Sequence, residues 1–595
     1  MHENNNLLNI RSLMHHYHLD AYIITMSDPH LSEYVAEHWK TIKWFCGFSG
    51  STGNIVVTQN FAGLWTDSRY FVQAEDQLKG TGINLVKLKI AHTPEFIDWI
   101  NEHVPAGSTI AFDGKVFPIN LVKTMESKLL GKKMKLETNI DLIAKLWENR
   151  PSMPYSEIFV HELKFAGKTC EEKLKSLRAR MKAQNMDYLI ISGLDDIAWL
   201  YNIRGKDIPY VPLVICYSII SQNESMLFID DNKVPDNIRK EIEIQGITIN
   251  RYDEIFNYTN RIEAGKRVSI QFSKTNYTLY KAIPENCILT DNLNITTILK
   301  AIKNDVEIAN IKETMVKDGL AMVKYLYWLY NAVGKERVTE ISASKKLRTF
   351  RAEQESFFDE SFAPISAYNA HSAMPHYCAA QETDTELKVP GIYLIDSGGQ
   401  YFGGTTDITR TIPLGNPTER QKNDFTLALK GTINLANAVF PIGTKGFQLD
   451  ILARKPLWDN GMNYGHGTGH GVGYFLNVHE GPQTIGTSAS GDLNTMLLPG
   501  MLISDEPAFY RDGEYGFRTE NLILVVEHKE TEFGKFLKFE TVTLCPIDLN
   551  LINKNLLDND EVEWLNTYHT EVYNKLSSFL SKNEKQWLKE NTRAI

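Results

Sequence analysis

The sequence predicts a three-domain protein of the α/β and α+β classes, in which two duplicated α/β domains precede a domain with the candidate catalytic residues. The chain has 595 residues, which suits about three domains of ordinary size. Two segments of its first half share one apolar pattern, and acidic residues and histidines gather in its last third. We therefore expect domains at 1–150, 151–300 and 301–530, followed by a helical extension at 531–595.

The first two predicted domains begin with the same succession of residues. In each, apolar residues at helical spacing lead to an aspartate and then to a run, AYIIT or YLIIS, that suits a buried strand. A constant separation relates Leu7, Ile10, Arg11, Met14, Asp20, Asp28 and Tyr34 to Leu174, Leu177, Arg178, Met181, Asp187, Asp195 and Tyr201. Chance similarity of two ordinary helix–strand units is the alternative. The constant separation favours duplication.

Breaks in the patterning indicate the remaining boundaries. Pro151 and Pro154, in LWENRPSMPYSEIF, predict a first linker. Near residue 300 a long amphipathic helix with mixed charge begins, in LKAIKNDVEIANIKETMVKDGLAMVKYLYWL. Helical patterning returns in VEWLNTYHTEVYNKLSSFLSKNEKQWLKENTRAI, which predicts the closing extension.

Composition restricts the class of protein. The net charge is −10 and there is no basic stripe, so nucleic acid is not expected as a partner. The six cysteines are scattered, which favours buried free thiols in a reducing compartment. The first residues do not have the pattern of a secretory signal, and no apolar run is long enough to span a membrane. We expect a cytoplasmic protein without a membrane partner.

The last third contains the most informative residues, a set of carboxylates and histidines. Four carboxylates placed together repel one another, and divalent cations remove that cost. The set therefore predicts a two-metal hydrolytic site. Its members are Asp396 in YLIDSGG, Asp407 in TTDITRT, His466 and His470 in GHGTGHGVG, His479 in NVHEG, Glu506 in SDEPAFY and Glu520 in FRTEN.

Local patterns place these residues on strands and turns. The stretch GIYLIDSGGQYFGGTTDITRTIPLG alternates apolar runs with glycine-rich turns, which predicts a hairpin that brings Asp396 and Asp407 together. The glycine spacing of GHGTGHGVG fits neither a dinucleotide-binding loop nor H-E-x-x-H, and it favours a strand or bulge that a metal and substrate can approach closely. DSGG lacks the preceding glycine and the upstream histidine motif of a serine protease.

The donor types indicate the metal. Four carboxylates and one imidazole form an oxygen-rich set that suits two Mn²⁺ ions, with Zn²⁺ or Co²⁺ as alternatives. No cysteine joins the set, which argues against structural zinc.

The residues in this order resemble the metallopeptidases with the pita-bread fold. The similarity is closest to the cytosolic, three-domain Xaa-Pro aminopeptidases, also called aminopeptidase P. It rests on HGTGHGVG, FLNVHEGP, the DEP and R-x-E-N segments, and also on SDPHLSEYVAE, GFSGSTG, LWTDSRYFVQA and LWENRP. The resemblance implies two creatinase-N-like α/β domains followed by a pita-bread catalytic domain.

The resemblance also implies a role for each candidate. Asp407 and Glu520 would bridge two divalent metals, Asp396 would bind one, and His470 and Glu506 would complete the other. A hydroxide between the metals would attack the scissile carbonyl, and Glu506 could relay a proton. His376 and His479 would hydrogen-bond the peptide and the tetrahedral intermediate. His466 would line the proline pocket, and Arg518 would orient ligands.

The implied activity is release of the first residue from peptides with proline in second place. A homodimer is expected, and Arg69 in TDSRYF is a candidate for contact with a neighbouring subunit's site, with a local salt bridge as the alternative. Prolidase, which cleaves only dipeptides, is the nearest rival, but the duplicated first half argues against it. A catalytically inactive peptide-binding relative or a creatinase-like hydrolase would lack metal ligands, whereas all five are present.

Overall fold

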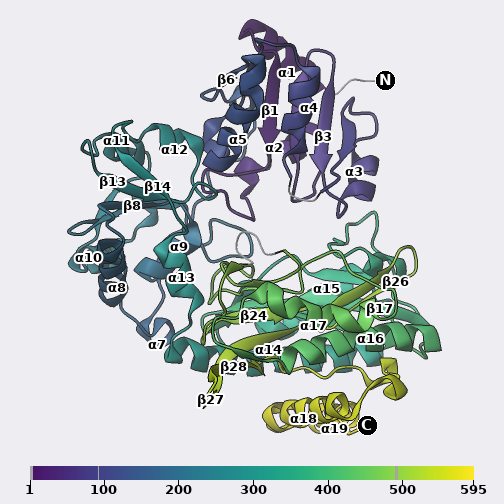
Figure 1. The fold of residues 1–595 in the computed structure, drawn as a ribbon. Helices are drawn as coiled ribbons and strands as arrows, with labels where there is room; N and C mark the ends of the chain where they lie inside the picture. Colours follow the sequence, from purple (N-terminus) through teal and green to yellow (C-terminus); the bar gives the residue numbers. More distant parts are fainter. Residues whose placement is uncertain (1–4, 91–92, 489–493) are drawn as a thin grey trace. The chain divides into compact units, whose positions relative to one another are not determined.

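The computed structural model describes residues 5–90, 93–488 and 494–595. The chain forms two compact units (Figure 1). One unit contains the residues up to Val160 together with Thr169–Thr296, and the other contains His161–Lys168 together with Thr297–Ile595.

The first unit begins with a six-stranded sheet in the order β4-β3-β2-β1-β5-β6. Alternate residues of a strand point to opposite faces, so Tyr22 and Ile24 join one apolar cluster while Ala21 and Ile23 join another. Both faces are therefore covered by helices. The strands are β1 (Ala21–Thr25), β2 (Asn54–Thr58), β3 (Ala62–Thr66), β4 (Asn84–Lys87), β5 (Thr109–Ala111) and β6 (Lys135–Glu137). One face packs on α1 (Asn5–His16), α2 (Thr41–Cys46), α3 (Phe71–Gln77) and α6 (Leu142–Leu146), and the other on α4 (Glu95–His103) and α5 (Ile119–Leu129).

A second sheet of the same unit repeats this topology, in the order β12-β11-β10-β8-β13-β14. In both copies the first strand lies between an antiparallel and a parallel neighbour. The predicted duplication of the α/β fold is confirmed. The strands are β8 (Tyr188–Ile191), β10 (Cys216–Ser221), β11 (Ser225–Ile229), β12 (Thr248–Arg251), β13 (Arg267–Ile270) and β14 (Ile288–Asp291), and the helices are α8 (Cys170–Ala183), α9 (Leu194–Tyr201), α10 (Asp236–Ile244), α11 (Glu254–Asn260) and α12 (Tyr277–Lys281).

The two copies diverge after their first strand. Asp195 and Tyr201 lie on α9, whereas the corresponding Asp28 lies just before a turn and Tyr34 lies in a bend. The turn at Asp28 instead contacts the second copy, because Tyr217 Oη and Asn276 Nδ2 both donate to Pro29 O, at 3.2 and 2.8 Å. A short pair, β7 (Phe159–Val160) and β9 (Ile203–Arg204), completes the strands of this unit.

The main part of the second unit, from Thr297 onward, contains the predicted long helix near its start. The chain passes from α13 (Ile295–Ala301) to α14 (Asp305–Ala332), and the Asn304 side chain accepts from Val306 and Glu307 N–H groups to cap α14. The unit's other helices are α7 (Leu163–Ala166), α15 (Glu340–Ala352), α16 (Glu419–Ala436), α17 (Gly446–Trp458), α18 (Asn559–Leu576) and α19 (Lys582–Asn591). The helices α18 and α19 lie in the predicted carboxy-terminal extension, and their buried faces pack on α14 and α16.

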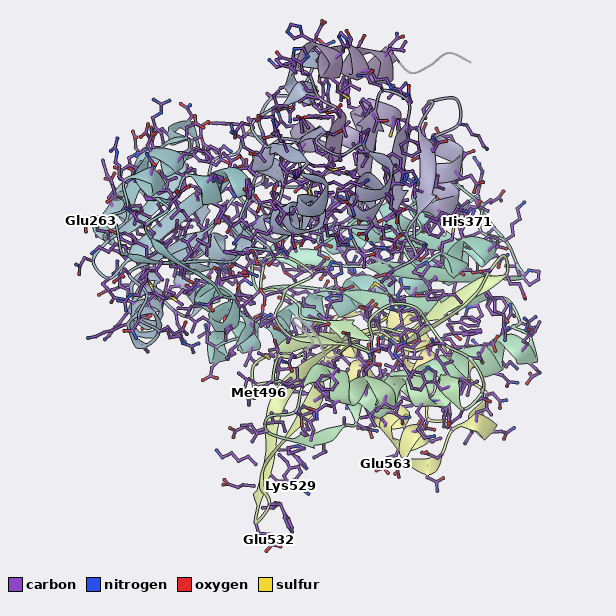
Figure 2. The ribbon with its side chains drawn as sticks, turned by 45° about the horizontal axis from the view of Figure 1, so that its top comes forward. Glu263, His371, Met496, Lys529, Glu532 and Glu563 are labelled. Carbon is purple, nitrogen blue, oxygen red and sulfur yellow. The ribbon has the colours of Figure 1, made fainter. Side chains whose placement is uncertain are left out.

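Short antiparallel sheets form the rest of this unit, in the orders β16-β17-β20 and β21-β28-β27-β24, with smaller groups β15-β18-β19, β22-β23 and β25-β26. The β27–β28 hairpin extends beyond its sheet toward Lys529 and Glu532 (Figure 2). The strands are β15 (Phe357–Glu360), β16 (Ile365–Tyr368), β17 (Gly391–Ser397), β18 (Gly399–Tyr401), β19 (Gly404–Thr405), β20 (Ile408–Leu414), β21 (Val439–Pro441), β22 (Gly469–His470), β23 (Thr484–Ile485), β24 (Leu502–Asp505), β25 (Ala508–Arg511), β26 (Tyr515–Arg518), β27 (Asn521–Thr531) and β28 (Gly534–Thr541).

The expectation that the cysteines are buried free thiols needs one correction. All six are free and five are buried, but Cys378 is exposed. It follows Tyr377 in a segment without helix or strand, so no layer of secondary structure covers it. Among the described helices, none is both long and apolar enough to cross a bilayer.

Candidate metal centre

The predicted hairpin supplies two of the candidate ligands. Strands β17 and β20 pair antiparallel, with Asp396 opposite Thr409. Asp407 was expected within the second strand, but it lies just before β20, in the gap after β19. Asp407 and Thr409 are two residues apart, so an extended backbone directs both side chains to the same side.

Glu520 reaches the same place from the position just before β27. Its backbone N–H donates to Thr409 O at 3.1 Å, and Thr409 Oγ1 donates to Glu520 Oε2 at 2.6 Å. The sequence reasoning missed Thr409, although its spacing from Asp407 was a usable signal. Thr409 therefore fixes both the backbone and the carboxylate of Glu520.

His470 lies on the short strand β22, where the glycines allow a close backbone approach. A Cβ atom at Gly469 would lie 1.9 Å from Ser504 O, and one at Gly471 would lie 2.1 Å from Glu480 O. The expected glycine-rich strand is therefore present. The His470 backbone N–H donates to Ser504 Oγ (3.0 Å), and Ser504 Oγ donates to Glu506 Oε1 (3.1 Å), which links the histidine strand to the DEP segment.

Three of the predicted ligands converge on one point. Asp407, His470 and Glu520 each offer a donor atom, and these atoms lie within 4.8 Å of one another. Glu506 adjoins them, with Oε1 at 3.4 Å from His470 Nε2. Asp396 has Oδ2 on Arg518 Nη2 at 2.6 Å, while its buried Oδ1 has no hydrogen-bond partner in the described structure. The cluster has a three-ligand centre flanked by two further carboxylates.

The electrostatics of the cluster suit cations. Burial raises the pKa of Glu520 well above its usual range, and the charges of Asp407 and Glu506 raise it further. Burial also raises the pKa of Asp396 and Glu506, and Arg518 partly offsets this in both. Burial alone would lower the pKa of His470, but the Asp407 and Glu506 carboxylates raise it to about 9. A divalent ion replaces the protons that such a set must otherwise hold, so the residues fit the metal that their chemistry predicts.

His466 and Arg518 meet at a tyrosine that the sequence reasoning did not identify. His466 Nε2 lies 2.9 Å from Tyr510 Oη, and Arg518 Nη1 donates to the same oxygen at 2.5 Å. Burial and the Arg518 charge lower the pKa of His466 to about 3, so its imidazole is neutral. Tyr510 follows Glu506 by four residues on β25, but nothing in the local pattern distinguishes it from a core aromatic residue.

His479 lies against His470, with ring centroids 4.3 Å apart at an interplanar angle of 76°. The next residue, Glu480, is buried and contacts Lys303 Nζ at 2.5 Å and Lys300 Nζ at 3.6 Å. These lysines precede α14, so their contacts with Glu480 attach the His479 segment to the region just before α14 in the second unit.

His376 is exposed and lies in a segment that one buried carboxylate holds on both sides. Glu340 Oε1 accepts from His371 Nδ1 (2.8 Å), and Oε2 accepts from Tyr377 Oη (2.9 Å). The His371 and Tyr377 rings stack at 4.3 Å. Glu340 thus fixes the ends of the His376 segment, a role that its position at the start of α15 did not reveal.

Arg69 belongs to the first unit and forms the local salt bridge that was its alternative assignment. Its Nη2 lies 2.7 Å from Asp67 Oδ2, and Thr52 Oγ1 accepts from the same nitrogen at 3.4 Å.

Comparison with protein-family models covers the chain in four segments. Residues 309–527 match the metallopeptidase family M24, and residues 535–595 match the C-terminal region of peptidase M24. Residues 7–145 and 149–307 each match the creatinase/prolidase N-terminal domain. The two matches in the first half agree with the repeated sheet topology.

Individual relatives match end to end. Aminopeptidase P1 of Arabidopsis thaliana is 36% identical, with 99% of each chain covered. A probable Xaa-Pro aminopeptidase P of Aspergillus fumigatus is 38% identical, covering 99% of this chain and 92% of the relative.

Solved structures give the same result. The X-prolyl aminopeptidase of Caenorhabditis elegans, described as a cytosolic enzyme with a di-nuclear active site, has a TM-score of 0.93 at 33% identity over 99% of both chains. The Xaa-Pro dipeptidase of Bacillus anthracis has a TM-score of 0.51 at 25% identity and covers only 64% of this chain. These matches show that the chain belongs to metallopeptidase family M24, with its pita-bread catalytic domain preceded by two creatinase-type domains.

Proposed function

We propose that this protein is an Xaa-Pro aminopeptidase, which releases the first residue from peptides with proline in second place. The observation that carries the proposal is the convergence of Asp407, His470 and Glu520 in a chain whose full length matches relatives with that name. The prolidase alternative is weaker, because the similarity to the Xaa-Pro dipeptidase of Bacillus anthracis extends over only 64% of the chain.

The residues that would hold two divalent ions are Asp396, Asp407, His470, Glu506 and Glu520, and Asp407 and Glu520 would be shared by both ions. When bound, the ions lower the pKa of water and polarise the scissile carbonyl. The oxygen-rich donors favour Mn²⁺, and Zn²⁺ and Co²⁺ are the alternatives. Arg518 holds Asp396 by a charge-assisted bond of 2.6 Å, and Glu506 is the group that accepts and returns a proton.

The proposed substrate contacts come from the histidines. His479 and His376 donate to the peptide carbonyl as negative charge develops on its oxygen. His466 is neutral and fixed by Tyr510, so it can form a wall of the proline pocket without placing a charge there. A tertiary Xaa-Pro amide has no N–H, so this pocket must recognise the ring rather than a donor.

The proposal extends to assembly and location. A homodimer is proposed, with Arg69 as the candidate contact to a neighbouring subunit's site. A cytoplasmic location is supported by the reducing-compartment cysteine pattern and by the description of the Caenorhabditis elegans enzyme as cytosolic.

A peptide panel tests the function directly. Metal is removed, Mn²⁺ is returned, and cleavage of Arg-Pro-Pro is compared with that of Arg-Ala-Ala, N-acetylated Arg-Pro-Pro and the dipeptide Arg-Pro. Cleavage of Arg-Pro-Pro alone, or of Arg-Pro-Pro with slower Arg-Pro, is expected. Equal rates on the alanine and proline tripeptides would refute proline selectivity, and activity confined to Arg-Pro would indicate a prolidase.

A further inference from the structure

Arg410 is a buried cation next to the metal centre, and its hydrogen-bond partners are uncharged. It is 2% exposed and directly follows Thr409. Within the described parts of the chain, its guanidinium has no carboxylate partner; it donates to Thr409 O, Glu520 O, Asn521 Oδ1, Cys545 O, Pro546 O and Tyr568 Oη. An arginine has five N–H donors, so this set can engage all of them. Removing a cation from water costs free energy. The complete set of acceptors around Arg410 offsets that cost.

The six acceptors belong to two parts of the catalytic unit. Three lie next to the candidate ligands Asp407 and Glu520, on β20 and at the beginning of β27 or just before it: Thr409 O (2.9 Å), Glu520 O (2.7 Å) and Asn521 Oδ1 (2.8 Å). The other three lie beyond β28: Cys545 O (2.9 Å), Pro546 O (3.1 Å) and Tyr568 Oη (2.9 Å). A single side chain therefore joins the ligand-bearing strands to the carboxy-terminal region.

The backbone that Arg410 holds is the one from which Glu520 extends. Thr409 Oγ1 orients the Glu520 carboxylate at 2.6 Å and accepts from Arg518 Nε at 3.0 Å. A shift of the Thr409 or Glu520 carbonyl groups would thus displace Glu520 itself. Residues that orient a metal ligand through hydrogen bonds commonly affect metal affinity.

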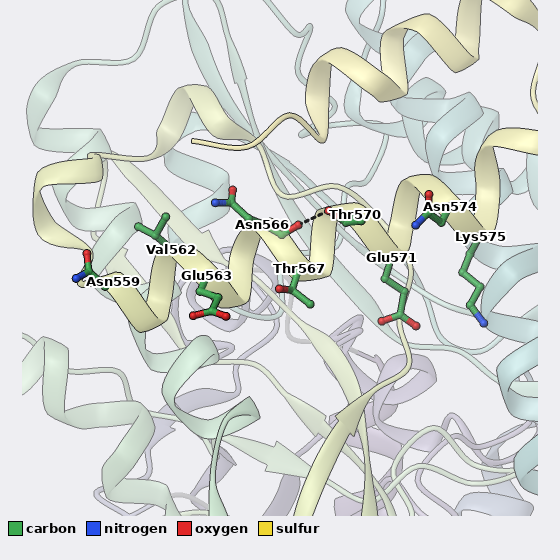
Figure 3. Close-up of a pocket in the computed structure, with 9 residues that line it drawn as sticks. All are labelled: Asn559, Val562, Glu563, Asn566, Thr567, Thr570, Glu571, Asn574 and Lys575. Atoms are coloured by element: carbon green, nitrogen blue, oxygen red, sulfur yellow. Dashed lines mark hydrogen bonds between the residues drawn. The ribbon is translucent and has the colours of Figure 1, made fainter.

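Tyr568 brings helix α18 into the same network. Its hydroxyl accepts from Arg410, lies 2.9 Å from Cys545 O, and belongs to a ring that stacks on Trp564 at 5.2 Å. The other side of α18 is different, with a shallow surface pocket of about 650 Å³ lined mainly by polar side chains (Figure 3). The buried residues of α18 also include Glu561 and His569, but the α18 group that accepts a hydrogen bond from Arg410 is the Tyr568 hydroxyl.

We propose that Arg410 and Tyr568 form a brace through which helix α18 holds Glu520 in position for metal binding. Both are positioning residues, since they act through the backbone of Thr409 and Glu520 and not on the substrate. The carboxy-terminal region then supports the metal centre as well as covering the apolar core. This inference rests on the proposed metal site, but not on the proposed preference for proline.

The test measures Mn²⁺ affinity by isothermal titration calorimetry on the full-length, metal-depleted protein. Arg410→Ala could fail to fold, so the decisive variant is Tyr568→Phe, which removes one oxygen and keeps the ring on Trp564. Glu561→Gln is the matched control, because buried Glu561 ties the same helix to Lys430 (2.5 Å) away from Arg410. We expect Tyr568→Phe to weaken Mn²⁺ binding about 10-fold, in the range typical of such partners, and Glu561→Gln to change it less than about 2-fold.

Two results would overturn the brace. One is wild-type affinity in a folded Tyr568→Phe protein, with folding checked by circular dichroism. The other is an equal loss of affinity in Glu561→Gln, which would indicate general loosening of α18. A wild-type protein that binds none of Mn²⁺, Zn²⁺ or Co²⁺ would refute the metal centre and the brace together. A protein that binds metal but cleaves Arg-Ala-Ala and Arg-Pro-Pro equally would refute only the proline preference.

Discussion

Two histidines, one in each compact unit, have pKa values shifted in opposite directions. His30 is buried in the first unit, where burial lowers its pKa to about 4 despite the charge of Asp28. His470 is half-buried, and Asp407 and Glu506 raise its pKa to about 9. Desolvation acts to lower the pKa of both imidazoles, so the neighbouring groups decide the outcome.

The neighbours also separate a structural histidine from a candidate ligand. His30 contacts two neutral groups, Ser192 O and Tyr252 Oη, each at 2.9 Å. His470 Nε2 lies 3.4 Å from both Asp407 Oδ2 and Glu506 Oε1, and within the described residues neither carboxylate has a salt bridge to a lysine or an arginine. The hydrogen bonds of His30 are satisfied with a neutral imidazole. The carboxylates beside His470 still require positive charge. That requirement is the strongest physical argument for metal.

The largest effect is expected at Asp407, which we propose as a ligand shared by two metals. Asp407→Asn replaces this charged carboxylate with a neutral amide, and turnover of Arg-Pro-Pro should fall by more than about 10³-fold, beyond the loss typical of one oxyanion donor. Metal content, measured by elemental analysis, should fall as well. The control is Asp459→Asn, an exposed partner of Lys455, which should leave both unchanged. Near-normal turnover with two metals bound would show that Asp407 does not bridge them.

A smaller effect is expected at His479, whose ring lies against His470. If it binds charge that develops only in the transition state, His479→Ala should lower kcat by about 10²–10³-fold and change KM little. Steady-state kinetics on Arg-Pro-Pro distinguish the two parameters. An unchanged kcat with a raised KM would assign His479 to ground-state binding instead.

The next test concerns Glu340, which accepts hydrogen bonds from residues on either side of His376. Both of its oxygens accept hydrogen bonds, from His371 and Tyr377 among others, so the amide of Glu340→Gln must direct an N–H at a donor. The His376 segment should then shift, and kcat/KM should fall on the order of 10-fold. Glu353→Gln, which affects a half-exposed partner of Lys324 near the same helix, is the control. Equal kinetics for the two variants would remove Glu340 from the positioning of His376.

Much of the fold could be predicted because its signals are local. The helix and strand that begin each α/β domain are encoded by Leu7 to Asp20 and by Leu174 to Asp187, where apolar spacing changes from helical to continuous. The long helix α14 has its cap and its amphipathic spacing within one stretch of sequence. The shared sheet order is consistent with the duplication, since segments with the same apolar pattern favour the same strand pairing.

The site was predictable in its ligands and less so in its supports. Asp396 and Asp407 lie within one hairpin, and the histidines share one glycine-rich stretch. By contrast, Tyr510 contacts His466 and Arg518, and Glu340 reaches Tyr377, across folded distances that leave no periodic signal in the chain. The contact between Arg410 and Tyr568 joins residues on β20 and α18. Such pairs depend on tertiary packing, which propensity and spacing do not encode.

The smallest effect on turnover is expected at His30, and it tests the other half of the comparison. The folded pKa, about 4, lies below the unfolded value of about 6.5. Stability from neutral His30 is therefore fully present above about pH 6.5 and is lost as pH falls through about 4, with a total of about 3 kcal/mol.

Urea unfolding of wild type and His30→Gln at pH 7.5 and 4.5 measures this effect, with exposed His15→Gln of the same domain as the control. Wild type and His15→Gln should lose more stability toward low pH than His30→Gln does, because only they retain the buried imidazole. At pH 7.5, His30→Gln should be less stable than wild type but should cleave Arg-Pro-Pro within about 2-fold of the wild-type rate, as expected for a residue outside the candidate site. If all three proteins show the same acid sensitivity, protonation of His30 is not opposed by its burial between Ser192 and Tyr252, and the contrast with His470 fails.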